Sequence, residues 1–418
     1  MPRLDAKTVL VGVSGGIACY KAAELVRALV TAGATVRVMM SAGAQQFITP
    51  LTLQTLSGHP VATDTFSLTQ ESEIGHIRLA DSADAVIIAP ATANIIGKLA
   101  AGIADDLLTT VLLATRAPVL LAPAMNVHMY ENPIVQENLG RLQAHGMRII
   151  APAEGFLACG YEGKGRLPDI EVLLAEVTRA VSPQDLRGER LLITAGPNRE
   201  PIDPVRFISN RSTGKMGFAV AAAAWARGAE VCLIAGPTAL PTPHGVHRRD
   251  VTTAAAMRDA VAAEFETATI LVMAAAVADY RPAHPAPEKL KKASGPLRLE
   301  LERTVDILGE WAPRKGQRTI VGFAAETQDV IANAERKLLQ KDLDLIVAND
   351  VAGSETGFAV DTNAVTIIDR SGHRESVPLM SKAAVADRVL DRIAALRQAS
   401  APERASGKEH RSRKAVRR

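Results

Sequence analysis

The stretch VLVGVSGGIACYKAAELVRALVTAG, residues 9–33, decides the fold of the first half of the chain. Val9–Val13 is an apolar run of the kind that forms a buried strand, and Ser14-Gly15-Gly16 is a turn. Ile17–Ala32 follows as an Ala- and Leu-rich helix, which Gly33 ends. A strand, a tight turn and a helix in this order predict a parallel sheet that is covered by helices.

The same unit repeats through the first half. Its other strands are apolar on both faces, as buried parallel strands are. We expect these strands at Thr35–Met40, Ala85–Ala89, Val119–Ala122 and Met147–Ile150, and helices at Asn94–Ala101, Asp105–Thr115 and Asn132–His145.

After a polar break at residues 182–189 the pattern starts again. We expect strands at Leu191–Thr194, Glu230–Ile234, Thr269–Ala274, Thr319–Phe323, Leu343–Ala348 and Ala364–Ile368, and helices at Gly217–Arg227, Val330–Gln340 and Ser381–Arg397. The sequence therefore predicts two tandem Rossmann-like α/β domains with parallel sheets, at 1–181 and 190–399, joined by the linker 182–189. The basic tail at 400–418 is expected to be disordered.

Composition excludes several functional classes. The chain has 418 residues with 47% hydrophobic and only 3% aromatic side chains, which disfavours a base-stacking surface for single-stranded nucleic acid. The net charge is +3, but residues 403–418 hold seven Lys or Arg against two Glu, so the two domains carry no basic surplus and no nucleic-acid partner is expected. Three scattered cysteines indicate a reducing cytoplasm. We expect no signal peptide and no membrane span.

Polar residues follow three first-half strands at their carboxyl ends, where open α/β sheets bind ligands. The turn at Ser14-Gly15 either holds an anion at the following helix or is a plain tight turn. Thr92 and Asn94 either cap a helix or face a ligand. Asn126 ends the motif Pro-Ala-Met-Asn. Three such strand ends on one edge favour a pocket.

Two further residues have both a structural and a functional interpretation. A lone histidine such as His76 is more often structural than catalytic. Cys159 lies in EGFLACGYEGKGR, residues 154–166, which holds four glycines in thirteen residues. A free cysteine is usually an inert buried residue. On a glycine-rich loop, however, an exposed thiol can reach into a site.

Five segments of the first half together resemble a known family. They are VGVSGGIACYK (11–21), FITPLTLQTLSG (47–58), GHIRLADSADAVIIAPATANIIGKLAAGIADDLL (75–108), PAMNVHMYENP (123–133) and ACGYEGKGR (158–166). In this order, over about 1–180, they resemble the flavin-containing cysteine decarboxylases. They are most similar to the decarboxylase half of the bacterial enzymes that fuse phosphopantothenoylcysteine decarboxylase to phosphopantothenate–cysteine ligase.

This resemblance implies a flavodoxin-like domain that binds FMN at the carboxyl edge of its sheet. His76 matches the active-site histidine, Asn126 the residue that holds the substrate carboxylate, and Cys159 the residue that donates a proton. The flavin would oxidise the substrate thiol and so make loss of the carboxylate possible. Tyr130 departs from the Trp of many relatives. The implied FMN contacts are Ser14, Gly15, Ser41, Thr92, Ala93, Asn94, Ile95 and Ala124.

The second half has its own strand-end motifs. The cluster Ser212-Thr213-Gly214-Lys215 at a helix start suits a phosphate or is a capped helix with a solvated lysine, and it is not a Walker A loop. Asp279 ends a strand and is available to a metal or a ribose. Lys289 lies on a Pro- and Lys-rich segment, which is either a solvated face or faces a triphosphate. Lys337 and Lys341 share one helix face.

The segments GPNREPIDPVRFISNRSTGKMG (196–217), AAAVADYRP (274–282), PEKLKK (287–292), GFAAET (322–327) and DLIVAND (344–350) resemble CTP-dependent phosphopantothenate–cysteine ligases. The resemblance implies an acyl-cytidylate, formed and consumed with the help of Asn210 and Lys289, and Mg²⁺ on the phosphates with Asp279 as its protein ligand. Val305 stands where relatives carry proline. The implied CTP contacts are Met273, Ala274, Ala275, Asp279, Lys289, Thr304, Val305, Asp306, Ile307, Phe323, Lys337 and Lys341.

Together the two resemblances imply a bifunctional cytoplasmic enzyme that makes 4′-phosphopantetheine from 4′-phosphopantothenate, L-cysteine and CTP. They also imply a homo-oligomer, in which trimers of the decarboxylase half are joined by ligase dimers into a dodecamer. Three alternatives stay open. The second half is degenerate and serves assembly, the chain is a nicotinamide oxidoreductase without the usual glycine fingerprint, or the basic tail binds nucleic acid.

Overall fold

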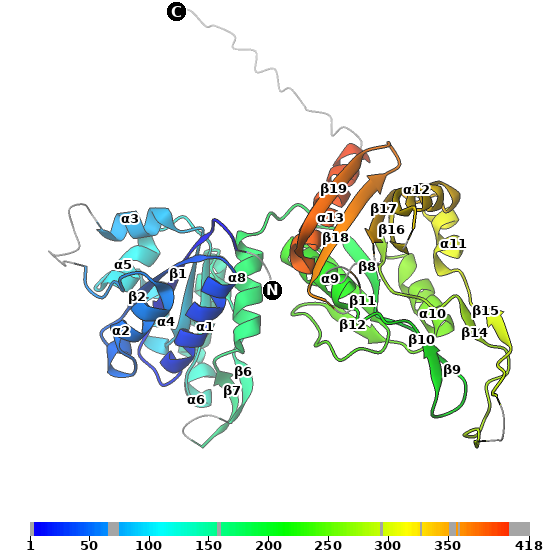
Figure 1. Ribbon diagram of the computed structural model, residues 1–418. Helices are drawn as coiled ribbons and strands as arrows, with labels where there is room; N and C mark the ends of the chain where they lie inside the picture. Colours follow the sequence, from blue (N-terminus) through cyan, green and yellow to red (C-terminus); the bar gives the residue numbers. More distant parts are fainter. Residues whose placement is uncertain are drawn as a thin grey trace, which may run out of the picture.

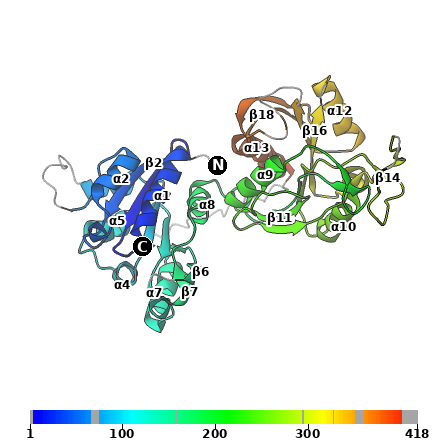
Figure 2. The same cartoon turned by 60° about the horizontal axis from the view of Figure 1, so that its bottom comes forward.

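The computed structural model describes residues 4–65, 75–156, 160–292, 296–326, 328–350, 357 and 360–400. It contains two α/β domains side by side, and the chain passes from one to the other after α8 (Figures 1 and 2). The expected tail beyond residue 400 and the predicted site residue Cys159 lie outside the described residues.

The first domain contains a five-stranded parallel sheet. Its spatial order is β2 (Thr35–Met40), β1 (Thr8–Val13), β3 (Ala85–Ala91), β4 (Val119–Pro123) and β5 (Arg148–Ile149). The helices of the domain are α1 (Cys19–Thr31), α2 (Pro50–Ser57), α3 (Gly75–Ser82), α4 (Ala93–Ala101), α5 (Leu107–Ala114), α6 (Val127–Tyr130), α7 (Pro133–Ala144) and α8 (Ile170–Val181).

The side chains of β1 alternate between two cores, because successive residues of a strand point to opposite faces. Val9, Val11 and Val13 pack on α1 and α8, whereas Leu10 packs with α4 and α5 on the other face. These residues are 0% exposed. The domain is therefore a three-layer sandwich whose carboxyl edge is left for the connecting turns. A short antiparallel pair, β6 (Ala153–Phe156) and β7 (Glu162–Arg166), lies outside the main sheet.

The second domain contains an eight-stranded sheet, and its order is β12 (His247–Asp250), β11 (Glu230–Ala235), β8 (Arg190–Ala195), β13 (Ile270–Met273), β16 (Thr319–Glu326), β17 (Leu345–Asp350), β18 (Thr362–Asp369) and β19 (Arg374–Ser381). The first six strands are parallel, while β18 and β19 are antiparallel additions at one edge. The prediction of a parallel sheet holds for these six strands but not for the strand expected at Ala364–Ile368, because an apolar run does not reveal in which direction a strand pairs.

Helices cover both faces of the second sheet. One core lies under α9 (Lys215–Ala226) and α13 (Lys382–Ser400), and the other lies under α10 (Ala254–Phe265), α11 (Ile307–Trp311) and α12 (Val330–Gln340). Two short ribbons stand outside the sandwich (Figure 1). They are β9 (Arg199–Pro201) with β10 (Phe207–Ser209), and β14 (Tyr280–Pro282) with β15 (Leu301–Arg303).

The two domains meet where α8 packs against α9. The guanidinium of Arg179 lies 4.5 Å from the centre of the Trp225 ring and donates a hydrogen bond to the Trp225 carbonyl. His244 Nε2 and Glu176 Oε1 are 3.0 Å apart. Within the part of the chain that the structure describes, none of the helices has both the length and the apolar character that a bilayer crossing demands.

Candidate active sites

In the first domain, Ser14 joins the turns that follow β1 and β3. Its hydroxyl donates to the Pro90 carbonyl at 2.7 Å and accepts the N–H of Thr92 at 3.0 Å. The buried thiol of Cys19 donates to the Ser14 carbonyl at 3.1 Å, and burial raises the pKa of this thiol. The predicted flavin contacts Ser14 and Thr92 are therefore neighbours, and Ser14 uses its side chain to hold the two turns together.

The turns after β1 and β2 approach each other backbone to backbone. A methyl group at Gly15 would lie 2.6 Å from the carbonyl carbon of Gly43, so only glycine fits there. Ser41 follows β2, and its hydroxyl accepts the N–H of Ala44 at 3.2 Å. The predicted contacts Ser14, Gly15 and Ser41 thus lie at one edge, at the turn before α1, which is the kind of turn where a phosphate can bind backbone N–H groups.

The other predicted flavin contacts belong to the neighbouring strand ends. Thr92 is the N-cap residue of α4, and Ala93, Asn94 and Ile95 form the first turn of that helix. Ala124 follows β4, and its N–H donates to the Ala91 carbonyl at 3.1 Å. The structure therefore brings the turns after β1, β2, β3 and β4 to the same carboxyl edge.

Asn126 is held between α6 and the β6–β7 hairpin. Its side-chain oxygen accepts the N–H of His128 at 2.9 Å and so caps α6. The N–H of Met125 donates to the Gly165 carbonyl at 3.0 Å, and a methyl group at Gly165 would lie 2.2 Å from the Met125 carbonyl oxygen. The glycine-rich segment thus packs against the Pro-Ala-Met-Asn turn. His76 is the second residue of α3 and is half-buried.

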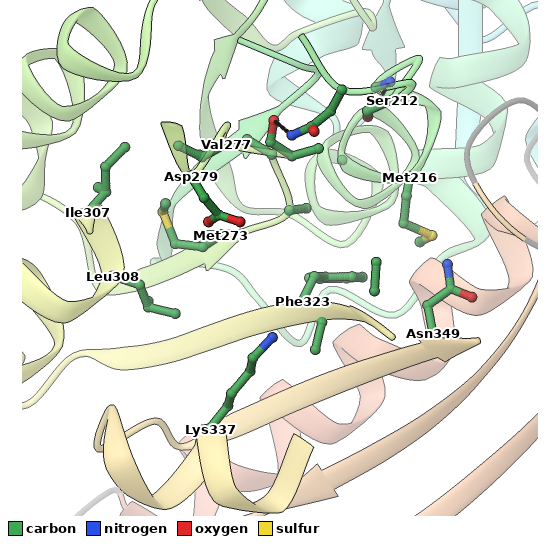
Figure 3. Close-up of a pocket in the computed structure, with 18 of the residues that line it drawn as sticks. Ser212, Met216, Met273, Val277, Asp279, Ile307, Leu308, Phe323, Lys337 and Asn349 are labelled. Carbon is green, nitrogen blue, oxygen red and sulfur yellow. Dashed lines mark hydrogen bonds between the residues drawn. The ribbon is translucent and has the colours of Figure 1, made fainter. Parts of the chain in front are cut away.

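The second domain holds a cavity of about 740 Å³ at the carboxyl ends of β13, β16 and β17. Figure 3 shows the Asp279 carboxylate directed into it, with Lys337 rising toward Phe323. Ile307 and Leu308 lie at one end. The predicted residues that line the cavity are Asn210, Met273, Ala274, Ala275, Asp279, Thr304, Val305, Asp306, Ile307, Phe323, Lys337 and Lys341.

Two of the lining lysines are paired with carboxylates. Lys337 Nζ donates to Glu326 Oε1 at 2.6 Å, and Lys341 Nζ donates to Asp306 Oδ1 at 2.9 Å. Asp306 also accepts the N–H of Gly309 at 3.0 Å. Burial opposes ionisation of Asp306, but the Gly309 N–H and the Lys341 ammonium outweigh it and lower the pKa of this carboxyl. The cavity wall therefore holds cations in fixed positions.

Two protein-family models match the chain, "Flavoprotein" over residues 2–182 and "DNA/pantothenate metabolism flavoprotein C-terminal domain" over residues 186–396. The "Coenzyme A biosynthesis bifunctional protein CoaBC" of Bacillus subtilis (strain 168) is 53% identical over 397 residues, which are 94% of this chain and 98% of that protein. Its counterpart in Escherichia coli (strain K12) is 47% identical over 93% of this chain and 97% of that protein.

The chain belongs to the family of coenzyme A biosynthesis bifunctional proteins. Membership makes it an enzyme with a decarboxylase and a ligase activity, in which a flavoprotein domain precedes the ligase domain. This agrees with the family that the sequence motifs resemble.

Solved structures are similar to each half separately. The C-terminal domain of a coenzyme A biosynthesis bifunctional protein CoaBC aligns with 41% identity and a TM-score of 0.45, over 52% of this chain and 99% of that one. The FMN-dependent cysteine decarboxylase SpaF aligns with 30% identity and a TM-score of 0.38, over 43% of this chain and 97% of that one.

Lys289 is placed differently from the other predicted ligase residues. It is exposed and does not line the cavity. Its neighbour Leu290 is hydrogen-bonded to the turn between β9 and β10. Asn210, in contrast, follows β10 directly and lines the cavity, where its side-chain N–H donates to the Ala276 carbonyl at 2.9 Å. The structure thus does not bring Asn210 and Lys289 together in one cavity wall.

Several lining residues are absent from the predicted CTP contacts. Lys215, the first residue of α9, belongs to the cluster that the sequence marked as suited to a phosphate, and it pairs with Asp361 at 2.7 Å. Lys382, the first residue of α13, is 6% exposed and donates to the Gly357 carbonyl at 2.9 Å. Burial, and then the neighbouring charge of Lys215, lower the pKa of Lys382 to about 8. Asn349, whose buried side-chain oxygen accepts no hydrogen bond within the described structure, lines the same cavity (Figure 3).

The start of α9 carried the one available signal for these residues, the Ser-Thr-Gly-Lys cluster. Lys382 gave none, because only the packing of α13 beside α9 brings it to the cavity. Asn349 lies in the motif DLIVAND, but sequence reasoning assigned it no role of its own. Among the described residues, no group of three or more His, Cys, Asp or Glu side chains is arranged to hold a metal ion.

Proposed function

We propose that the second domain joins 4′-phosphopantothenate to L-cysteine with CTP through an acyl-cytidylate, and that the first domain decarboxylates the product to 4′-phosphopantetheine. One observation carries the ligase assignment. The cavity at the carboxyl edge is about 740 Å³, large enough for a nucleotide, and combines apolar walls with fixed lysines. A carboxylate needs such an activating nucleotide because amines do not attack carboxylate anions usefully.

Within this proposal each lining residue has a stated role. Met273 and Phe323 supply apolar surface to the nucleoside, and the carboxylate of Asp279 accepts hydrogen bonds from the ribose or binds the metal. Lys337 and Lys341 offset phosphate charge, which rises as pyrophosphate leaves. Asn210 acts on the acyl-phosphate centre from the cavity wall, and Lys289 reaches that centre from the neighbouring segment outside the wall. The cytosine lies beside Thr304–Ile307.

The cavity can hold Mg²⁺ through a single protein carboxylate. Asp279 lines the cavity, and the described residues offer no further acidic or histidine cluster around it. Mg²⁺ is commonly bound through one or two carboxylates together with substrate phosphates and water. We therefore assign Asp279 as a single protein ligand of an ion that arrives with the triphosphate.

The residues at the carboxyl edge of the first domain also fit their cofactor, FMN. The close approach of Gly15 to Gly43 leaves backbone that a phosphate can reach, while Thr92–Ile95 at the start of α4 and Ala124 border the same edge. Bound FMN supplies the electron sink that a cysteine carboxylate lacks. Asn126 orients the substrate carboxylate, His76 lies in the active site and Cys159 donates a proton to carbon.

We further propose a cytoplasmic homo-oligomer, built from trimers of the decarboxylase half and dimers of the ligase half into a dodecamer. The domains are residues 1–181 and 190–399. Exposed apolar residues support such assembly in both halves, for example Ile17 and Tyr20 on the first domain and Phe207 on the β9–β10 ribbon. Reduced thiols are consistent with the cytoplasm.

The two-site proposal is tested by two substitutions. Cys159→Ser should slow decarboxylation by about 100-fold or more, because a positioned proton donor contributes that much, and should leave amide formation unchanged. Lys289→Gln should slow amide formation and leave decarboxylation unchanged. Both activities are followed by mass spectrometry of the products. Loss of both activities in either folded variant would contradict two independent sites.

A further inference from the structure

Asp203 carries a buried carboxylate at the turn between β9 and β10. Its residue exposure is 3%, and its side chain accepts five hydrogen bonds. Oδ1 accepts the N–H groups of Val205 and Arg206, both at 2.8 Å. Oδ2 accepts Arg206 Nε at 2.9 Å. Arg206 and these N–H groups hold the pKa of Asp203 well below its usual range.

The same ion pair binds a distant peptide group. The N–H of Leu290 donates to Asp203 Oδ2 at 3.1 Å, and Arg206 Nη2 donates to the Leu290 carbonyl at 2.9 Å. Both polar groups of Leu290 are therefore held by one carboxylate–guanidinium pair. Next to it, the N–H of Ala286 donates to the Ile202 carbonyl at 2.9 Å.

These contacts fix the backbone that carries Lys289. Among the described residues 287–292, Leu290 alone makes hydrogen bonds to the rest of the chain. The β9–β10 ribbon that holds Leu290 continues directly into Asn210 at the cavity. Asp203 thus connects the attachment point of Lys289 to the same ribbon that delivers Asn210.

We infer that Asp203 is a positioning residue for Lys289, an inference that rests on the proposed ligase function. The Asp203 carboxylate is buried while the Arg206 side chain is half-exposed, and such a pair adds little net stability because desolvation of the carboxylate offsets the attraction of the charges. The effect of the Asp203–Arg206 pair is instead to fix the orientation of the Leu290 peptide. With the Leu290 peptide fixed, the Lys289 ammonium samples a small volume in the substrate complex, and misplacing a reacting group by about 1 Å costs on the order of 100-fold in rate.

The test begins with Asp203→Asn, which keeps the size of the side chain and removes its charge. We expect kcat for amide formation to fall about 10- to 100-fold. The KM for CTP should change by less than about twofold, because Asp203 does not line the cavity. Amide hydrogen exchange of a peptide that covers residues 286–292 should accelerate, and decarboxylation should be unaffected.

A matched control is Glu302→Gln, because Glu302 pairs with Arg281 on the neighbouring β14–β15 ribbon and does not contact Leu290. It should behave as wild type. If Asp203→Asn fails to fold, Arg206→Lys is the second variant, because it keeps the positive charge and removes the contact that two guanidinium nitrogens make with Asp203. It should give the same acceleration of hydrogen exchange and the same fall in kcat.

The decisive comparison is Asp203→Asn made in the Lys289→Gln background. If Asp203 acts through Lys289, the double variant should be no slower than Lys289→Gln alone. If Asp203→Asn lowers kcat by the same factor in the wild-type and Lys289→Gln backgrounds, or if it leaves kcat at the wild-type value, the inference is overturned and the proposed function is not. A wild-type protein that forms no amide with CTP would overturn the proposed function and the inference with it.

Discussion

Asp306 combines two interactions at the rim of the ligase cavity. It caps α11 by accepting the Gly309 N–H, and it pairs with Lys341. The preceding residue is Val305, so no proline ring restricts this turn and the side chain of Asp306 holds it. An acceptor at the N-cap stabilises a helix start, whereas the pairing needs the charge.

Two substitutions separate these contributions. Asp306→Asn keeps a capping oxygen and loses the ion pair, so we expect a raised KM for CTP with little loss of stability. Asp306→Ala loses the cap as well, and its free energy of unfolding should be lower than that of Asp306→Asn by about 1 kcal/mol. Urea unfolding of both variants measures the difference. Equal stability of the two variants would show that the cap contributes nothing.

At the scale of the element, the β6–β7 hairpin explains the glycine-rich segment. The sequence predicted a glycine-rich loop there, since glycines without apolar alternation give no strand signal. The structure instead forms two strands whose glycines allow close contact with the turn before Asn126. Gly165 has φ of 154°, and Gly163 has φ of 152° with Val127 2.8 Å from the place of a methyl group.

Gly165→Ala therefore tests the hairpin. A methyl group there would collide with the Met125 carbonyl, so we expect decarboxylation to fall at least about 10-fold while CTP-dependent amide formation is retained. Gly155→Ala is the matched control, because its φ is 141° but a methyl group would meet only Arg166 Nη1 at 3.8 Å. Equal effects of both variants would assign the loss to backbone strain instead of contact.

The parallel strands were largely predictable from sequence, whereas the edge strand β19 and the short ribbons outside the sheets were not. The parallel strands are continuous apolar runs, such as β1 and β3, and burial on both faces requires that pattern. The polar strand β19, Arg374–Ser381, and the three-residue ribbons have no such pattern. The cavity edge was predictable because strand ends of one sheet meet there. Lys382 was not, because tertiary packing alone brings it to the cavity.

At the scale of the whole molecule, a charged cluster joins the domains. Glu176 of α8 contacts His244 of the second domain and Arg148 of the first. Burial opposes ionisation of Glu176, but the bonds from His244 and Arg148 outweigh it, so its pKa is lowered. The stabilisation is present above the unfolded pKa of about 4.3 and is lost as the pH falls through the lowered value.

Glu176→Gln tests this contact between the domains. At neutral pH we expect the variant to lose about 1 to 2 kcal/mol of stability and to be cleaved faster by protease in the linker 182–189, with both activities kept. As the pH falls below the unfolded pKa of about 4.3 the stability difference should shrink, and it should vanish below the lowered pKa, where the folded wild-type carboxyl is protonated too. Glu171→Gln, on an exposed position of the same helix, should match wild type. A pH-independent difference would contradict the assignment to the carboxylate.

The most direct measurement of the central claim is mass spectrometry of the products formed by the purified full-length chain. The protein is mixed with 4′-phosphopantothenate, L-cysteine and Mg²⁺, with and without CTP. Two sites acting in sequence predict 4′-phosphopantetheine only when CTP is present. If phosphopantothenoylcysteine supplied directly were decarboxylated while CTP, phosphopantothenate and cysteine gave no amide, the second domain would not be a working ligase and the account would be contradicted.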